Sequence, residues 1–230
     1  MPRRRWIPIV GFVVVGGALI AGLISISIGE QGPNTFRVQG SGEAQRLFGG
    51  LEQRENDVGA VGAPVTISVF NDLQCLECAD FHFETVPALV EDIVRPGDAR
   101  LALRHFSQSR KPTQISALAS TAAGEQGAQW QYAHIFLSNL DQIPEIGITQ
   151  EFLATLAAAI PGPEFNVPAW EEDFGGDEVQ ARVFSDAELA TDLRLPAGPA
   201  VVVDGPGGTV ELVQSPSVAE IAAAVDEVSE

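Results

Sequence analysis

Cysteine and histidine are scarce in this sequence, whose 230 residues include two cysteines and three histidines. A structural zinc ion is held by four such ligands, usually contributed as two pairs. The two cysteines form one pair, but the three histidines form no second pair at a recognisable spacing. We therefore expect no bound metal, and nothing in the sequence predicts an organic cofactor.

Basic residues are also few. The chain has 13 basic and 31 acidic residues, which gives a formal net charge of −18 at pH 7, and Lys111 is the only lysine. A surface with this excess of negative charge repels phosphate groups. The composition therefore argues against binding to nucleic acid or to anionic lipid headgroups, and we interpret the acidic surface as a means of staying soluble.

Charged side chains are absent from Trp6 to Ile28, a stretch of 23 residues. A helix of this length spans roughly 34 Å, at about 1.5 Å per residue, and crosses a membrane. Arg3–Arg5 precede it and favour a cytoplasmic N-terminus. We expect residues 1–28 to be a single-pass anchor in the cell membrane, with the rest of the chain extracytoplasmic. A cleaved signal peptide is the alternative, although its apolar core is usually shorter.

Residues 29–44 are polar, rich in glycine and without hydrophobic periodicity, so they predict a linker. The remaining residues, 45–230, suffice for one domain with a substantial hydrophobic core. No internal repeat is visible in them.

Both cysteines lie in one motif, Cys75-Leu-Glu-Cys78. Before it, Val65 to Phe70 is a β-branched, apolar run typical of a buried strand. After it, apolar residues recur at helical spacing as far as Ile93. Backbone N–H groups and the helix dipole stabilise a thiolate at a helix N-terminus, and a partner three residues on is within reach of a disulfide. We therefore interpret Cys75 as an attacking thiolate and Cys78 as the resolving thiol.

Two other interpretations of this motif stay open. A static disulfide between Cys75 and Cys78 would close a loop so short that it removes little entropy from the unfolded chain, which makes it a weak structural link. A metal site would need ligands that the spacing of the histidines does not predict. Redox chemistry is the interpretation that we favour.

The rest of the chain predicts a sheet interrupted by helices. Residues 51–55 suggest a short edge strand, and Arg100 to Phe106 alternates as a strand does. Because Arg95-Pro-Gly-Asp98 ends the helix after the cysteines, a strand, a helix and a strand follow in order and predict a parallel pair of strands. Amphipathic or alanine-rich helical segments then follow at 113–124, 130–140, 149–160 and 177–193.

Strand patterns return near the C-terminus. Residues 200–203 and 209–213 predict two strands joined by a hairpin turn at 204–208. Ser217 and Glu220 form a capping box, which predicts the start of a last helix. The predicted fold class is therefore α/β, with a helical insertion at about 110–194.

This order, with Cys-x-x-Cys at the start of the first helix, resembles a thioredoxin fold, and the long helical insertion resembles the DsbA-like thiol–disulfide oxidoreductases. The matching stretches are Phe70-Asn-Asp-Leu-Gln-Cys75-x-x-Cys78 with Phe81-His82, Arg104-His-Phe106, Trp130-Gln-Tyr132-Ala-His134 and Leu195-Pro-Ala-Gly198-Pro199-Ala-Val-Val-Val203-Asp-Gly205. The resemblance covers nearly all of the chain after the predicted linker. The resemblance implies a cis peptide bond before Pro199, packed against the cysteines, and pairing of the Gly198 backbone with an extended substrate segment. It also implies a quinone-linked membrane oxidase as the partner that reoxidises Cys75 and Cys78.

Several residues depart from the family's pattern or have more than one possible role. Glu77 lies between the cysteines, and its charge should destabilise the Cys75 thiolate and make the protein a weaker oxidant. Gly198 replaces the threonine or valine that is usual before the proline. Asp72 should cap the helix, with proton relay as its alternative, and His82 is either a tuning residue or a hydrogen-bonded core histidine.

We therefore expect a membrane-tethered, extracytoplasmic thiol–disulfide oxidoreductase of DsbA-like type that forms disulfides in cysteine-containing exported proteins. A disulfide reductase is the first alternative, but such reductases usually carry tryptophan at the position of Gln74 and a short insertion. A non-catalytic binding module on a thioredoxin scaffold is the second alternative. Trp130, Tyr132 and His134 are interpreted as packing residues in each case.

Overall fold

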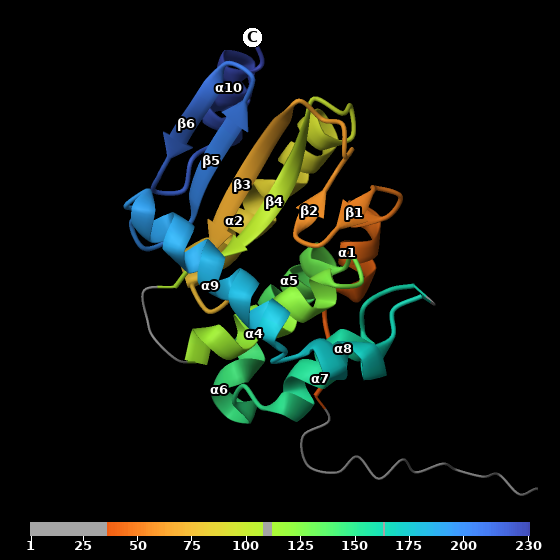
Figure 1. The fold of residues 1–230 in the computed structure, drawn as a ribbon. Coiled ribbons are helices and arrows are strands. Elements are labelled where there is room, and N and C mark those ends of the chain that lie inside the picture. Colours follow the sequence, from red (N-terminus) through yellow and green to blue (C-terminus); the bar gives the residue numbers. More distant parts are fainter. Residues whose placement is uncertain (1–35, 108–111, 163) are drawn as a thin grey trace, which may run out of the picture. The chain divides into compact units, whose positions relative to one another are not determined.

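The computed structural model describes residues 36–107, 112–162 and 164–230. Within them, six strands form one sheet in the order β1-β2-β4-β3-β5-β6. Figure 1 shows β5 and β6 at one edge of this sheet, next to α10, and β1 and β2 at the other edge. The strands are β1 (Gln53–Arg54), β2 (Asp57–Val58), β3 (Val65–Asn71), β4 (Ala99–His105), β5 (Ala200–Gly205) and β6 (Gly208–Leu212).

The two central strands, β3 and β4, are parallel, and the other neighbouring pairs are antiparallel. Three short helices connect β3 to β4, namely α2 (Leu76–Glu84), α3 (Val86–Leu89) and the π-helical turn η1 (Val90–Val94). The predicted parallel pair is therefore confirmed. The single helix predicted after the cysteines is instead broken near Pro87, because proline lacks the N–H that would continue the helical hydrogen bonds.

Alternating side chains of the central strands point to opposite faces of the sheet. One face buries Ile67 and Val69 of β3 together with Leu101 and Leu103 of β4, each fully buried. They pack in the main hydrophobic core with the helices that follow β3 and with α10 (Val218–Val228).

The other face is covered by α9 (Asp177–Asp192) and the loop after it. A smaller core there joins Phe70 of β3 and Val202 of β5 to Ala190 and Leu195.

The helical insertion lies between β4 and β5, and Figure 1 shows most of it gathered below the sheet. Tryptophan and tyrosine side chains form its centre: Trp130, Tyr132 and Trp170 are buried, and Trp170 donates its indole N–H to the Ala119 carbonyl at 2.9 Å. Its other helices are α4 (Pro112–Gly124), α5 (Gln129–Leu137), η2 (Leu140–Gln142), α6 (Ile143–Ile146), α7 (Gln150–Ala158) and α8 (Val167–Asp173).

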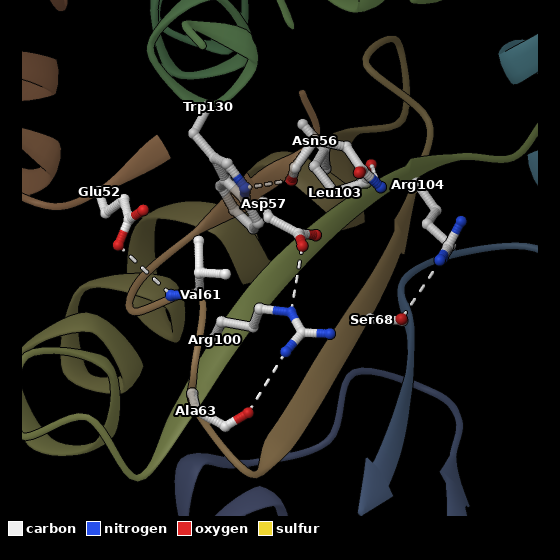
Figure 2. A network of polar contacts seen from close by, with 10 residues as sticks. All are labelled: Glu52, Asn56, Asp57, Val61, Ala63, Ser68, Arg100, Leu103, Arg104 and Trp130. Atoms are coloured by element: carbon white, nitrogen blue, oxygen red, sulfur yellow. Dashed lines mark hydrogen bonds and ion pairs between the residues drawn. The ribbon is translucent and has the colours of Figure 1, made fainter. Parts of the chain in front are cut away.

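Figure 2 shows a network of polar contacts at this side of the sheet, one of which joins the insertion to it. Trp130 of α5 donates its indole N–H to the carbonyl of Asn56 at 2.9 Å. Beside it, Arg100 of β4 donates to Asp57 Oδ2 at 3.1 Å and to the Ala63 carbonyl at 3.3 Å. Burial raises the pKa of Asp57, and the guanidinium of Arg100 opposes that rise.

The C-terminal elements follow the sequence prediction. Gly205 pairs with Gly208, so β5 and β6 form a hairpin with a two-residue turn. The hydroxyl of Ser217 accepts a hydrogen bond from the Glu220 N–H, and the Glu220 carboxylate accepts one from the Ser217 N–H at 2.8 Å, which confirms the capping box at the start of α10.

Several helices were not predicted, among them α6 (Ile143–Ile146), α8 (Val167–Asp173) and α1 (Ser41–Phe48). α1 overlaps the end of the predicted linker, 29–44, and buries Ala44 and Phe48 in the main core. The predicted anchor, residues 1–28, lies outside the described residues. In the part of the chain that the structure describes, no helix is long and apolar enough to cross a membrane. The proposed domain boundaries therefore stay predictions.

Candidate active site

Cys75 is the N-cap residue of α2. Its backbone is extended, with φ −92° and ψ 122°, and its Sγ atom accepts a hydrogen bond from the Cys78 N–H at 3.1 Å. Such a backbone N–H is one of the donors that a helix leaves unpaired in its first turn. Because an anionic sulfur accepts a hydrogen bond better than a neutral thiol, this contact stabilises a Cys75 thiolate. The Cys75 side chain is partly exposed, so a substrate sulfur can approach it.

Cys78 lies one turn into α2 and is fully buried. Burial raises the pKa of its thiol, the hydrogen bond with Cys75 raises it further, and the backbone at Asp72 acts in the opposite direction. Both cysteines are free thiols in this structure, which therefore represents the reduced pair. The two sulfurs thus have unequal surroundings, one reachable and the other hidden.

The loop before α2 is held by Asp72. Its Oδ1 atom accepts a hydrogen bond from the Gln74 N–H at 2.9 Å, and its carbonyl accepts one from the Cys75 N–H at 3.0 Å. The prediction that Asp72 caps the helix is therefore wrong. Asp72 lies three residues before the N-cap position, which Cys75 itself occupies, and its carboxylate closes the turn that presents Cys75 instead.

Cys75 faces a hollow of about 210 Å³. Its lining comes from the loop before α2, the first turn of α2, the loop after β4 and the loop before β5, namely Asp72, Cys75, Glu77, Phe106, Ser107, Ala197 and Gly198. Leu76 stands beside it with 73% of its surface exposed. Large aliphatic side chains are seldom left so open, and this one adds an apolar contact next to the reachable sulfur.

The loop before β5 differs from its prediction. No peptide bond is cis among the described residues, so the expectation of a cis bond before Pro199 is wrong in this structure. Gly198 has φ +95°, a conformation that glycine adopts without steric cost, and it turns the chain while the bond to Pro199 stays trans. A Cβ atom placed on Gly198 would lie 3.3 Å from Glu77 Oε2. Glu77 and Gly198, the two residues that depart from the family's pattern, are therefore neighbours in space.

The thioredoxin family model matches residues 53–207. The chain belongs to the thioredoxin family. It is also 24% identical, over 153 residues, to the probable disulfide bond formation protein D of Bacillus anthracis, an alignment that covers 66% of this chain and 70% of that relative.

Solved structures share the fold of this thioredoxin-family protein. Oxidised BdbD from Bacillus subtilis superposes with a TM-score of 0.64 at 18% identity, over 77% of this chain and 96% of that one. DsbA from Chlamydia trachomatis superposes with a TM-score of 0.60 at 23% identity, over 75% of this chain and 90% of that one. The chain is a DsbA-like member of the thioredoxin superfamily and a thiol–disulfide oxidoreductase, as the sequence predicted.

His82 follows the cysteines on α2 but is a core histidine of this thioredoxin fold. It is buried, its Nε2 lies 3.1 Å from Nδ1 of His134, and its ring stacks on Trp130. Burial and, to a smaller extent, the neighbouring His134 together lower the pKa of His82 to about 3. Burial also lowers the pKa of His134, against the effect of the nearby Glu43 carboxylate. His82 is therefore neutral near pH 7 and holds α2 against α5.

A buried group beneath the end of β4 was missed in the sequence. Asp186 of α9 accepts a hydrogen bond from Arg104 at 2.9 Å and another from the His105 N–H at 3.0 Å. Burial raises the pKa of Asp186, and these two donors lower it. A signal was available, because Asp186 falls on the same helical face as Val183 and Ala190, both of which are buried.

In the described part of the chain, no three histidine, cysteine, aspartate or glutamate side chains are placed to hold a metal ion. The sulfurs of Cys75 and Cys78 are free there to take part in thiol–disulfide exchange.

Proposed function

We propose that this protein is a membrane-tethered, extracytoplasmic oxidoreductase that forms disulfides in exported proteins. The observation that carries the proposal is the unequal placement of the two sulfurs, since Cys75 is partly exposed beside the hollow and Cys78 is buried. This division suits an enzyme in which one sulfur exchanges with substrates and the other forms and breaks the disulfide within the enzyme.

Disulfide formation starts from the oxidised pair. A substrate thiolate attacks Cys75 Sγ, the Cys75–Cys78 bond breaks, and its electron pair passes to Cys78 Sγ, which takes up a proton. Because burial raises the pKa of Cys78, the protonated thiol is its favoured form after this step. The substrate is now joined to Cys75 through a mixed disulfide.

A second substrate thiolate completes the exchange. It attacks the substrate sulfur of the mixed disulfide, and Cys75 leaves as a thiolate that the Cys78 N–H stabilises at 3.1 Å. The substrate loses two electrons and two protons overall, and the cysteine pair gains them once Cys75 is protonated. A membrane oxidase that passes electrons to quinone would restore the disulfide.

The proposed cellular location rests on the N-terminal sequence. Arg3–Arg5 and the uncharged run from Trp6 to Ile28 favour an anchor that leaves the cysteines outside the cytoplasm, where disulfides persist. Recovery of a membrane-bound protein that still carries Trp6 would support the anchor. A soluble form that begins after Ile28 would show cleavage instead.

The direction of the reaction is tested by trapping the cysteines in the cell. Cultures are quenched in acid, and free thiols are alkylated with a reagent that shifts mobility on a gel. An oxidase should have Cys75 and Cys78 mostly oxidised at steady state, because its recycling partner keeps removing electrons. A mostly reduced pair would overturn the oxidase and favour a disulfide reductase.

A further inference from the structure

The hollow beside Cys75 carries charge of one sign. Asp72 and Glu77 are its only charged members among the described residues, and both are acidic. They come from separate places, the loop before α2 and the first turn of α2. A substrate segment that reaches Cys75 must therefore pass close to two carboxylates.

The two carboxylates reach the hollow in different ways, since Asp72 is fixed by a hydrogen bond and Glu77 is an exposed side chain. Asp72 is held in its turn by the Gln74 N–H at 2.9 Å. Glu77 Oε2 extends to the loop before β5, 3.3 Å from the position of a Cβ atom on Gly198. A side chain larger than hydrogen at residue 198 would crowd that carboxylate, so Gly198 leaves Glu77 room at the hollow.

Negative charge at this place affects substrates according to their own charge. At about 12 Å in water, one pair of unit charges changes a rate or an affinity roughly twofold, so replacing a basic substrate side chain with an acidic one changes it roughly threefold for each carboxylate. A basic side chain next to the substrate cysteine would be attracted by both carboxylates, and an acidic one would be repelled by both. The effect should weaken with salt, because the screening length falls to about 10 Å at 0.1 M ionic strength.

We propose that Asp72 and Glu77 make this site selective for substrate cysteines flanked by basic side chains. This inference rests on the proposed function, because it assumes that a substrate thiolate attacks Cys75. It specifies the substrate class of the same site, namely extended cationic segments that contain cysteine. Glu77 then affects the choice of substrate as well as the reduction potential of the cysteine pair.

The test uses three synthetic dithiol peptides that differ only in the residues beside the first cysteine, which are arginine, alanine or glutamate. The purified, oxidised full-length protein is mixed with each peptide, without any reoxidant, and the rate of peptide oxidation is followed by mass spectrometry. The arginine peptide should react about tenfold faster than the glutamate peptide at low salt. The ratio should fall towards one at about 1 M salt, where the screening length is about 3 Å.

Two matched variants locate the effect. Glu77→Gln removes one carboxylate from the hollow, whereas Glu84→Gln removes an exposed carboxylate of the same helix that does not line it. Both change the net charge by one unit. We expect Glu77→Gln to reduce the ratio of arginine to glutamate rates about threefold or more, and Glu84→Gln to leave it nearly unchanged.

The ratio separates charge selectivity from reactivity, because a change in the intrinsic reactivity of Cys75 affects all three peptides alike. Equal rates for the three peptides, with the alanine peptide oxidised normally, would overturn the selectivity and leave the proposed function intact. Equal effects of Glu77→Gln and Glu84→Gln would overturn the role of the hollow. Failure to oxidise any peptide would overturn both proposals.

Discussion

Gly198 adopts a backbone conformation that other residues enter only with strain, so Gly198→Ala should destabilise the protein. An L-residue in the left-handed region loses about 1–2 kcal/mol relative to glycine. The added Cβ would also meet Glu77 Oε2 at 3.3 Å, but the Glu77 side chain is exposed and can move, so this contact should add little. We expect a loss of about 1–2 kcal/mol in the free energy of unfolding, or about 2–8 °C in Tm.

Gly62→Ala is the matched control. Gly62 lies in the turn before β3, has no left-handed φ, and has no neighbouring atom within 4 Å of an added Cβ. Alanine there restricts the unfolded chain and should leave stability unchanged or raise it by about 0.4–1 kcal/mol. Chemical unfolding of the two variants and the parent protein, followed by circular dichroism, measures the difference directly.

Equal stability of Gly198→Ala and Gly62→Ala would refute this reasoning. That result would mean that residue 198 does not need the left-handed conformation, and the trans bond before Pro199 would lose its explanation. A loss at Gly198 that disappears in the Glu77→Ala background would assign the cost to the side-chain contact instead of the backbone.

Three further predictions concern titration, the buried ion pair and the dipeptide between the cysteines. His82→Phe should reduce the loss of stability on acidification. Burial lowers the pKa of His82 from 6.5 to about 3, so the unfolded chain binds a proton that the folded protein does not. His82 therefore lowers the free energy of unfolding by about 1.4 kcal/mol for each pH unit below 6.5. If the free energies of unfolding of the parent protein and His82→Phe fell equally between about pH 7 and pH 5, this explanation would be contradicted. Asp186→Asn should lower the free energy of unfolding by about 1–3 kcal/mol, because it weakens the hydrogen bonds that Asp186 accepts from Arg104 and from the His105 N–H. An unchanged midpoint of urea unfolding would show that these two hydrogen bonds contribute nothing to stability. Glu77→His should raise the reduction potential of the cysteine pair, measured in equilibrium with glutathione, by about 10–30 mV, because it removes a negative charge near the Cys75 thiolate. An unchanged reduction potential would contradict this role of Glu77.

Much of the fold could be predicted because its signals are local. The β-branched run of β3, the alternation of β4 and the capping box at Ser217 each occupy a few consecutive residues. The order of these elements then limited the topology to a parallel central pair. The break of the helix near Pro87 was also visible in principle, since proline interrupts helical hydrogen bonds.

Short helices were harder to predict. α1 buries only Ala44 and Phe48, which is too little periodicity to distinguish a helix from a linker. α8 carried a usable signal that was not recognised, because Asn166 accepts a hydrogen bond from the Ala169 N–H and Pro168 lies in the first turn. Cap chemistry was more informative there than hydrophobic pattern.

The candidate active site also has features that could be predicted from local sequence and others that could not. The placement of Cys75 at the start of a helix and of Cys78 one turn inside follows from spacing alone. Contacts between distant segments do not, and they include the closeness of Glu77 to Gly198 and the bonds from Asp186 to β4. Such contacts depend on how the insertion and the loop before β5 pack, which no short stretch of sequence specifies.

The division of roles between the two sulfurs is tested most directly by comparing Cys78→Ala and Cys75→Ala on non-reducing gels. Cys78→Ala keeps the reachable sulfur but lacks the thiol that can attack Cys75 Sγ and resolve a mixed disulfide, so it should accumulate reducible adducts with exported proteins. Cys75→Ala keeps only the buried thiol and should trap almost nothing. Equal trapping by the two variants would contradict the assignment of Cys75 as the sulfur that exchanges with substrates.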